Sequence, residues 1–221
     1  MRSTPRRLLV VSAIGAALVA SAVPAQAQVA TASRLVLAAG HVDVVDVEYE
    51  DGVLEIGVHD ETVDPGVERE PDDVLFKVKR EARTTVPTDP AFGFLGAPGA
   101  PVWILPEAQD ESLLWPGLSS EELEAGVFSG DAVTLSVVRV VGPGQLAVYT
   151  ENAVGQPNLL IDSGDGTPDT IGLNVGGHLH ANWAFDQAGT YTVKVKAIAT
   201  LAASGQRVSS ETVNLRFVVK S

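Results

Sequence analysis

Hydrophobic and polar residues alternate through several short segments of the chain, and a period of two residues predicts β-strands. The clearest example surrounds Asp51 and Gly52, which have apolar residues at every second position on both sides. Asp-Gly suits a two-residue type I′ turn, because both central residues of that turn need a positive φ. The sequence therefore predicts a β-hairpin in which Glu50 pairs with Val53.

Counting outward from this turn assigns each side chain of the hairpin to one of its two faces. An uninterrupted count places His41 and Asp43 on the core face with Val45, near Asp60 at the open end of the hairpin. The same count points His59 to the other face, and a bulge of one residue would reverse that assignment. The hairpin thus carries two of the four histidines of the chain.

Further strands and one helix follow from the same reading. The other predicted strands span residues 29–37, 74–78, 132–141, 145–151, 158–162, 191–199 and 211–219, and the last two form a hairpin around residues 203–206. Ser119 with Glu122 matches a capping box and predicts one short helix that ends near Gly126. Short strands separated by glycine and proline turns favour an all-β, immunoglobulin-like β-sandwich in a single domain.

A turn that contains glycine precedes the strand that starts at Tyr191. Asp186, Gly189 and Tyr191 are spaced as in the corner of immunoglobulin-like sandwiches, where a tyrosine hydroxyl bonds back to the backbone. We therefore expect the Tyr191 hydroxyl to bond to the backbone of this turn.

The alternation is lost between residues 84 and 117, a long loop rich in proline, glycine and aromatic residues. This segment holds six of the thirteen prolines and two of the three tryptophans. Its apolar content argues against disorder. Two interpretations stay open: the loop covers the sandwich, or it exposes Phe92, Phe94, Trp103 and Trp115 as a contact surface.

The first 27 residues have the features of a secretion signal. Arg2, Arg6 and Arg7 precede an apolar run, and Ala-Gln-Ala at 25–27 is a small-residue cleavage site. We therefore expect a signal peptide over residues 1–27 and a single secreted domain over residues 28–221. An uncleaved signal segment would be the means of holding this domain to a membrane.

Charge and cysteine content narrow the classes of partner. Removing the three arginines of the signal changes the formal net charge from −13 to −16. This charge argues against nucleic acid as a binding partner and favours the binding of cations. Because the chain has no cysteine, a disulfide framework is excluded. A transition-metal site in this protein must therefore use histidine, aspartate and glutamate.

His178 and His180 are the strongest candidates for such a site. In an extended strand, residues two apart project from the same face, so both imidazoles can reach one point. If the strand of His41 lies nearby, three imidazoles converge, and zinc fits such a set best. Manganese would need more oxygen donors, which Asp43 or Asp60 would supply. The alternative is that each histidine is a polar strand residue whose nitrogens are satisfied by hydrogen bonds.

The sequence gives little support for catalysis. The G-x-S-x-G nucleophile elbow and the H-E-x-x-H helix do not occur in the chain. A zinc ion held by three histidines can activate water, but the spacing of residues marks out no general base. We therefore expect a protein that is not an enzyme.

Several motifs distributed over the predicted domain resemble those of a known family. They are GHVDV (40–44), FLG (94–96), VWILP (102–106), LLWPG (113–117), GPG (142–144), and HLHANWAF (178–185) with GTY (189–191). Together they resemble the actinobacterial surface-anchored protein domain, also known as the choice-of-anchor M domain. The resemblance implies an exported cell-envelope protein, often encoded beside an ABC transporter whose binding protein resembles those for zinc or manganese. By position it marks His41, His178, His180, Asn182 and Trp183, and less closely His59.

Two functions follow from these observations. We expect a secreted module that binds a divalent transition metal, Zn²⁺ or else Mn²⁺, through His41, His178 and His180, with His59 or an aspartate completing the site. It would exchange metal with the substrate-binding protein of an ABC transporter. The alternative is a non-catalytic adhesion or envelope-scaffold module that uses the aromatic loop 92–115 as its contact surface.

Overall fold

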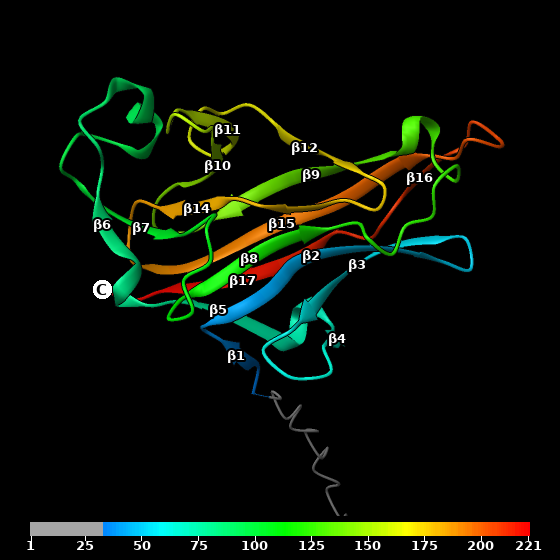
Figure 1. Cartoon of the computed structure of the whole chain (residues 1–221), viewed down its shortest axis with the longest axis horizontal. Helices are drawn as coiled ribbons and strands as arrows, with labels where there is room; N and C mark the ends of the chain where they lie inside the picture. The colour runs from blue at the N-terminus through cyan, green and yellow to red at the C-terminus, as the bar shows by residue number, and fades with distance from the viewer. Residues whose placement is uncertain (1–32) are drawn as a thin grey trace, which may run out of the picture. The chain divides into compact units, whose positions relative to one another are not determined.

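Seventeen β-strands form three sheets in a computed structural model that describes residues 33–221 (Figure 1). The predicted signal peptide and the start of the predicted strand 29–37 lie outside the described residues. Sheet A has the order β1 (Leu35–Leu37), β5 (Val74–Val78), β17 (Val213–Val219), β15 (Gly189–Thr200), β9 (Ala132–Val141) and β12 (Asp169–Asn174), with β16 (Arg207–Ser209) paired to β15. Sheet B has the order β13 (His178–His180), β8 (Leu114–Ser119), β2 (Gly40–Glu50), β3 (Val53–Asp60) and β4 (Val67–Arg69). Sheet C has the order β11 (Pro157–Asp162), β10 (Leu146–Glu151), β14 (Asn182–Phe185), β7 (Pro101–Leu105) and β6 (Arg83–Thr85).

Alternate residues of the three sheets meet in one hydrophobic core, so the predicted all-β sandwich is confirmed. Aromatic side chains from sheets A and C occupy its centre. Trp183 packs on Phe217 with ring centroids 5.4 Å apart, and Phe185 meets Tyr191 edge to face at 5.0 Å. Buried aromatic pairs of this kind add to the stability that the apolar area supplies.

The turn predictions are confirmed at both ends of the molecule. Asp51 and Gly52 have φ values of 50° and 85°, and Glu50 pairs with Val53 as a type I′ hairpin requires. The Tyr191 hydroxyl donates to the carbonyl oxygen of Gln187 at 2.9 Å, which fixes the turn before β15.

A bulge in β2 corrects the predicted orientation of His41 and Asp43. The register of β2 shifts relative to β3 between Asp43 and Asp46, and relative to β8 between Asp43 and Val45. The extra residue reverses the alternation, so His41 and Asp43 leave the sheet on the face away from the hydrophobic core. Asp43 pairs directly with His59, and paired residues share a face. The prediction that His41 and Asp43 face the core is therefore wrong.

The helix predicted from the Ser119 capping box does not form. Ser119 belongs to β8, and the backbone of Ser120 bonds to the loop before β13 instead of starting a helix. Ser120 N donates to Gly177 O at 2.9 Å, and its hydroxyl donates to Asn174 O at 2.7 Å. Short 3₁₀ turns occur elsewhere, at Pro71–Asp73, Arg80–Ala82, Pro90–Leu95 and Ser129–Asp131. Within residues 33–221 no helix has the length and apolar character needed to cross a membrane.

The segment from 84 to 117 is more regular than predicted and folds against the sandwich. It contributes β7 and most of β8, separated by turns. Phe92 and Trp103 are buried, and Phe92 belongs to a second small apolar cluster with Tyr149 on sheet C. Of the two interpretations, the structure favours the cover over the exposed aromatic surface.

Candidate metal centre

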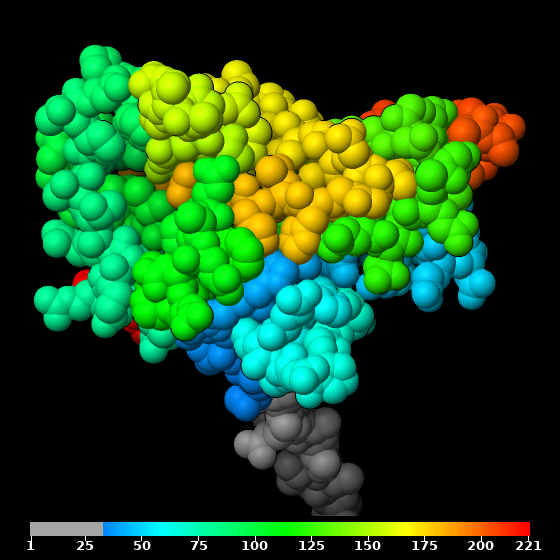
Figure 2. Space-filling model, in the orientation of Figure 1, coloured from blue at the N-terminus to red at the C-terminus, as the bar shows by residue number. Residues whose placement is uncertain are grey.

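Sheet B places all four histidines of the chain on one face. Because residues that pair across neighbouring strands share a face, the register of the five strands identifies rows of side chains. One row crosses the whole sheet through His180, Gly117, Asp43, His59 and Glu68. A second row contains His178, Ser119, Asp46 and Gly57. The loop after β3 lies near this face and brings Glu61 to it; Figure 2 shows this segment in cyan against the blue of β2.

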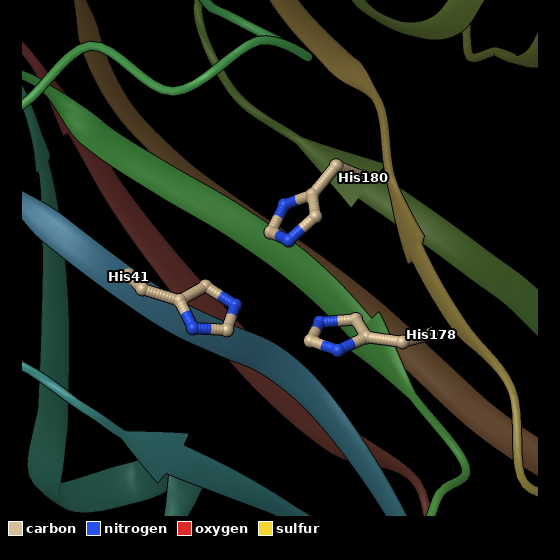
Figure 3. Close-up of side chains that lie close together, drawn as sticks. All are labelled: His41, His178 and His180. Atoms are coloured by element: carbon tan, nitrogen blue, oxygen red, sulfur yellow. The ribbon is translucent and has the colours of Figure 1, made fainter.

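His41, His178 and His180 converge over β8 (Figure 3). One ring nitrogen from each histidine lies within 4.8 Å of the other two. The ring centroids are 4.9 to 5.1 Å apart. The predicted convergence of these three imidazoles is therefore present, and it depends on β8 lying between β2 and β13.

Each of the three rings has its Nδ1 atom beside an acceptor. A histidine that donates its Nδ1 proton keeps the lone pair of Nε2 free for a metal ion. The three Nδ1 contacts are His41 to Glu61 Oε2 at 2.6 Å, His178 to Glu121 Oε2 at 3.1 Å, and His180 to Pro116 O at 3.0 Å. This arrangement leaves Nε2 as the free ligand atom in every ring.

Asp43 lies against the triad as a fourth donor. Its side chain is only 4% exposed, and Oδ1 lies 2.7 Å from His178 Nε2 and 3.4 Å from His41 Nε2. Both Asp43 Oδ1 and His41 Nε2 are buried and lack a hydrogen-bond partner. Buried polar atoms without partners are costly, and a shared cation would satisfy both.

Gly117 creates the space in which these groups meet. A Cβ atom at this position would overlap Asp43 Oδ1 and would lie 2.6 Å from His178 Nε2. Gly117 pairs with Asp43 on one side and with His180 on the other. The missing side chain therefore allows the carboxylate and the imidazoles to approach one another across β8.

Trp115 supports the ring of His180. The two rings stack with centroids 3.6 Å apart and an interplanar angle of 5°. Trp115 Nε1 donates to Glu107 O at 2.8 Å, while Asn182 Oδ1 accepts from Glu107 N at 2.9 Å. Asn182 thus acts on the site through Glu107 and Trp115, whereas Trp183 is buried in the core. Neither motif residue contacts the histidine triad as a ligand would.

The charge state of the triad differs between its members. The Asp43 carboxylate raises the pKa of His41 to about 9 against the opposing effect of burial, and Glu61 adds to the increase. Burial lowers the pKa of His180, so this ring is neutral at pH 7 and ready to act as a ligand. Without a metal ion, a proton on His41 takes the place of a cation between the two carboxylates.

The structure does not bring Asp60 or His59 into the triad. Asp60 pairs with Val42, points to the core face, and accepts from Arg69 Nε at 2.7 Å. His59 Nε2 lies 3.7 Å from Glu61 Oε1, so Glu61 stands between His59 and His41. His59 belongs instead to a separate group with Asp46 and Glu68.

Three imidazole nitrogens and one carboxylate oxygen form a donor set that suits Zn²⁺. In tetrahedral zinc sites the ligand atoms are about 3.3 Å apart, as follows from Zn–N bonds of about 2.0 Å. The side chains of His41 and His178 are 14% and 23% exposed, so an ion can enter from solvent.

Comparisons with protein-family models, with curated proteins and with solved structures find no match to this chain.

Proposed function

We propose that this protein is an exported, non-catalytic module that binds a divalent zinc-like ion through His41, His178, His180 and Asp43. One observation carries the proposal: every Nδ1 atom of the triad lies beside an acceptor, which leaves three Nε2 atoms and one buried carboxylate around one point. If these histidines were only polar strand residues, His41 Nε2 and Asp43 Oδ1 would be expected to have partners.

Zinc is favoured over manganese at the triad because nitrogen donors outnumber oxygen donors. The acidic composition of the chain raises the local concentration of cations around the protein. Export rests on the predicted signal peptide. Exchange of metal with the binding protein of an ABC transporter rests on the resemblance to the actinobacterial surface-anchored protein domain.

The adhesion alternative has weaker support. It relies on the aromatic residues of the loop 92–115 as a contact surface, but Phe92 and Trp103 are buried. Trp115 is stacked on His180 and bonded to Glu107, so it serves the candidate metal centre. Phe94 is partly buried and packs against Phe92 and Tyr149.

Calorimetric titration of the purified protein with zinc tests the proposal. His178→Ala removes one ligand from the edge strand β13 and is expected to weaken zinc binding by about 10-fold to 100-fold. His59→Ala removes a histidine from the same sheet face but outside the triad, so its affinity for zinc at the triad should match that of the wild type.

Two results would count against the triad. The first is equal zinc affinity in wild type and His178→Ala. The second is an equal loss in His178→Ala and His59→Ala, which would show that the charge of the face, and not the geometry of the triad, holds the ion.

A further inference from the structure

A second group of ligand atoms lies on the same face of sheet B. Asp46, His59 and Glu68 each offer one ligand atom, and these atoms lie within 4.8 Å of one another. His59 Nδ1 contacts Glu68 Oε1, and the two residues pair across β3 and β4. None of the three is a ligand of the triad. The bulge in β2 turns Asp46 toward this group, since the register shift ends at Asp46.

Asp46 is buried and incompletely satisfied. The residue is 3% exposed, and its Oδ1 has no hydrogen-bond partner. Five buried side-chain nitrogen or oxygen atoms among residues 33–221 lack a hydrogen-bond partner. Asp46 Oδ1 is one of them, and His41 Nε2 and Asp43 Oδ1 are two more. Unpartnered buried atoms therefore gather on this sheet face, once at the triad and once at Asp46.

Gly57 lies beneath the second group, although a side chain there would crowd its neighbours less than one at Gly117 would. A Cβ atom at Gly57 would lie 3.3 Å from Glu68 Oε2 and 3.7 Å from Glu48 Oε1. Two carboxylates therefore lie over this glycine, next to Asp46 in the paired strand. Burial and the neighbouring Glu68 raise the pKa of Glu48 to about 7, and burial raises the pKa of Asp46 to about 6.

No arginine neutralises this group from the neighbouring strand. Arg69 follows Glu68 in β4, but its Nε donates to Asp60 on the opposite face of the sheet. A surface cavity of about 470 Å³ beside Glu48 and Glu68 is lined by three further glutamates, Glu50, Glu122 and Glu124. Glu68 therefore borders an acidic cavity that attracts cations.

We propose that Asp46, His59 and Glu68 form a second divalent-cation site, which takes a harder ion of the Mn²⁺ class. Two carboxylates and one imidazole supply more oxygen than nitrogen, the opposite of the triad, and oxygen donors favour manganese. The site shares no ligand with the triad, and Glu61 lies between His41 and His59. Its ligand set is therefore separate from that of the proposed zinc centre.

Electron paramagnetic resonance of Mn²⁺, measured on protein loaded with one zinc ion per chain, tests this site because bound Mn²⁺ loses the sharp signal of the free ion. We expect one Mn²⁺ ion bound by each chain. The double variant Asp46→Asn with His59→Ala should bind Mn²⁺ at least about 10-fold more weakly and should keep its zinc. Glu68→Gln, a change at the exposed ligand of the site, should also weaken Mn²⁺ binding.

Two controls separate this site from the general charge and from the triad. Asp51→Asn removes one negative charge at the hairpin tip, where asparagine also accepts a positive φ, and should leave Mn²⁺ binding unchanged. His178→Ala should lose zinc affinity but keep Mn²⁺. The proposal is overturned if wild type binds no Mn²⁺ at about 1 mM, or if Glu68→Gln and the double variant bind it as tightly as wild type. Loss of Mn²⁺ from His178→Ala would also overturn it, because the ion would then occupy the triad.

Discussion

Gly117→Ala is expected to weaken zinc binding strongly without unfolding the protein. The added methyl group would overlap Asp43 Oδ1 and press on His178 Nε2, so the carboxylate and the imidazoles could no longer surround one ion. Because Gly117 lies in a strand and has no positive φ, the alanine backbone is unstrained and only the space is lost. We expect zinc affinity to fall by about 100-fold or more, with a stability cost of about 1–3 kcal/mol from overpacking.

Gly172→Ala is the matched control for this substitution. Gly172 also lies in a strand, β12, and a Cβ atom there would have no atom within 4 Å. Its replacement should leave zinc affinity unchanged and should raise stability by up to about 1 kcal/mol, because alanine loses less entropy on folding. Calorimetry with zinc and thermal unfolding without zinc measure both effects. If Gly117→Ala binds zinc like the Gly172→Ala variant, the ion does not lie over β8.

Asp43→Asn is expected to remove most of the pH dependence that His41 gives to the stability of the metal-free protein. In the wild type the pKa of His41 rises from 6.5 to about 9, chiefly because of Asp43. Since the folded state holds this proton more tightly, the stabilisation is fully present below about pH 6.5 and disappears as the pH rises through about 9. We expect the proton on His41 to contribute about 2 kcal/mol to the free energy of unfolding, after allowing for partial screening by solvent.

Urea unfolding of the metal-free protein at about pH 6 and about pH 10 checks this expectation. Wild type should lose stability over this interval relative to Asp43→Asn, and the comparison cancels groups that titrate equally in both proteins. Proton resonances of the His41 ring should show the same change as a lower pKa in the variant. Parallel stability profiles for the two proteins would mean that Asp43 does not hold the proton on His41.

The strands could be predicted from alternation alone where that alternation is uninterrupted. Val74–Val78 and Ala132–Val141 form strands with the predicted bounds, and Tyr191 makes the predicted bond to the backbone. The prediction that His41 lies on the core face is wrong because a bulge in β2 reverses the alternation. The sequence of β2 does carry a signal of this bulge. Polar residues occupy odd positions up to Asp43 and even positions from Asp46, and the two valines between Asp43 and Asp46 are both buried.

The candidate centre could be predicted only in part. The H-x-H pair was enough to place His178 and His180 on one face, but their meeting with His41 depends on β8, which lay mostly inside the segment read as a loop. The acceptors Glu61 and Glu121 are supplied by loops, and no local pattern marks them. The role of Gly117 depends on contacts across three strands, so it becomes apparent only in the folded sheet.

X-ray absorption at the zinc edge, recorded on the zinc-loaded protein, tests most directly whether the histidines share one ion. The spectrum should show four nitrogen or oxygen neighbours at about 2.0 Å, with the multiple scattering of three imidazoles. In His178→Ala one imidazole should be missing from that signature. A wild-type spectrum with six oxygen neighbours, or with fewer than three imidazoles, would contradict a zinc ion held by His41, His178 and His180.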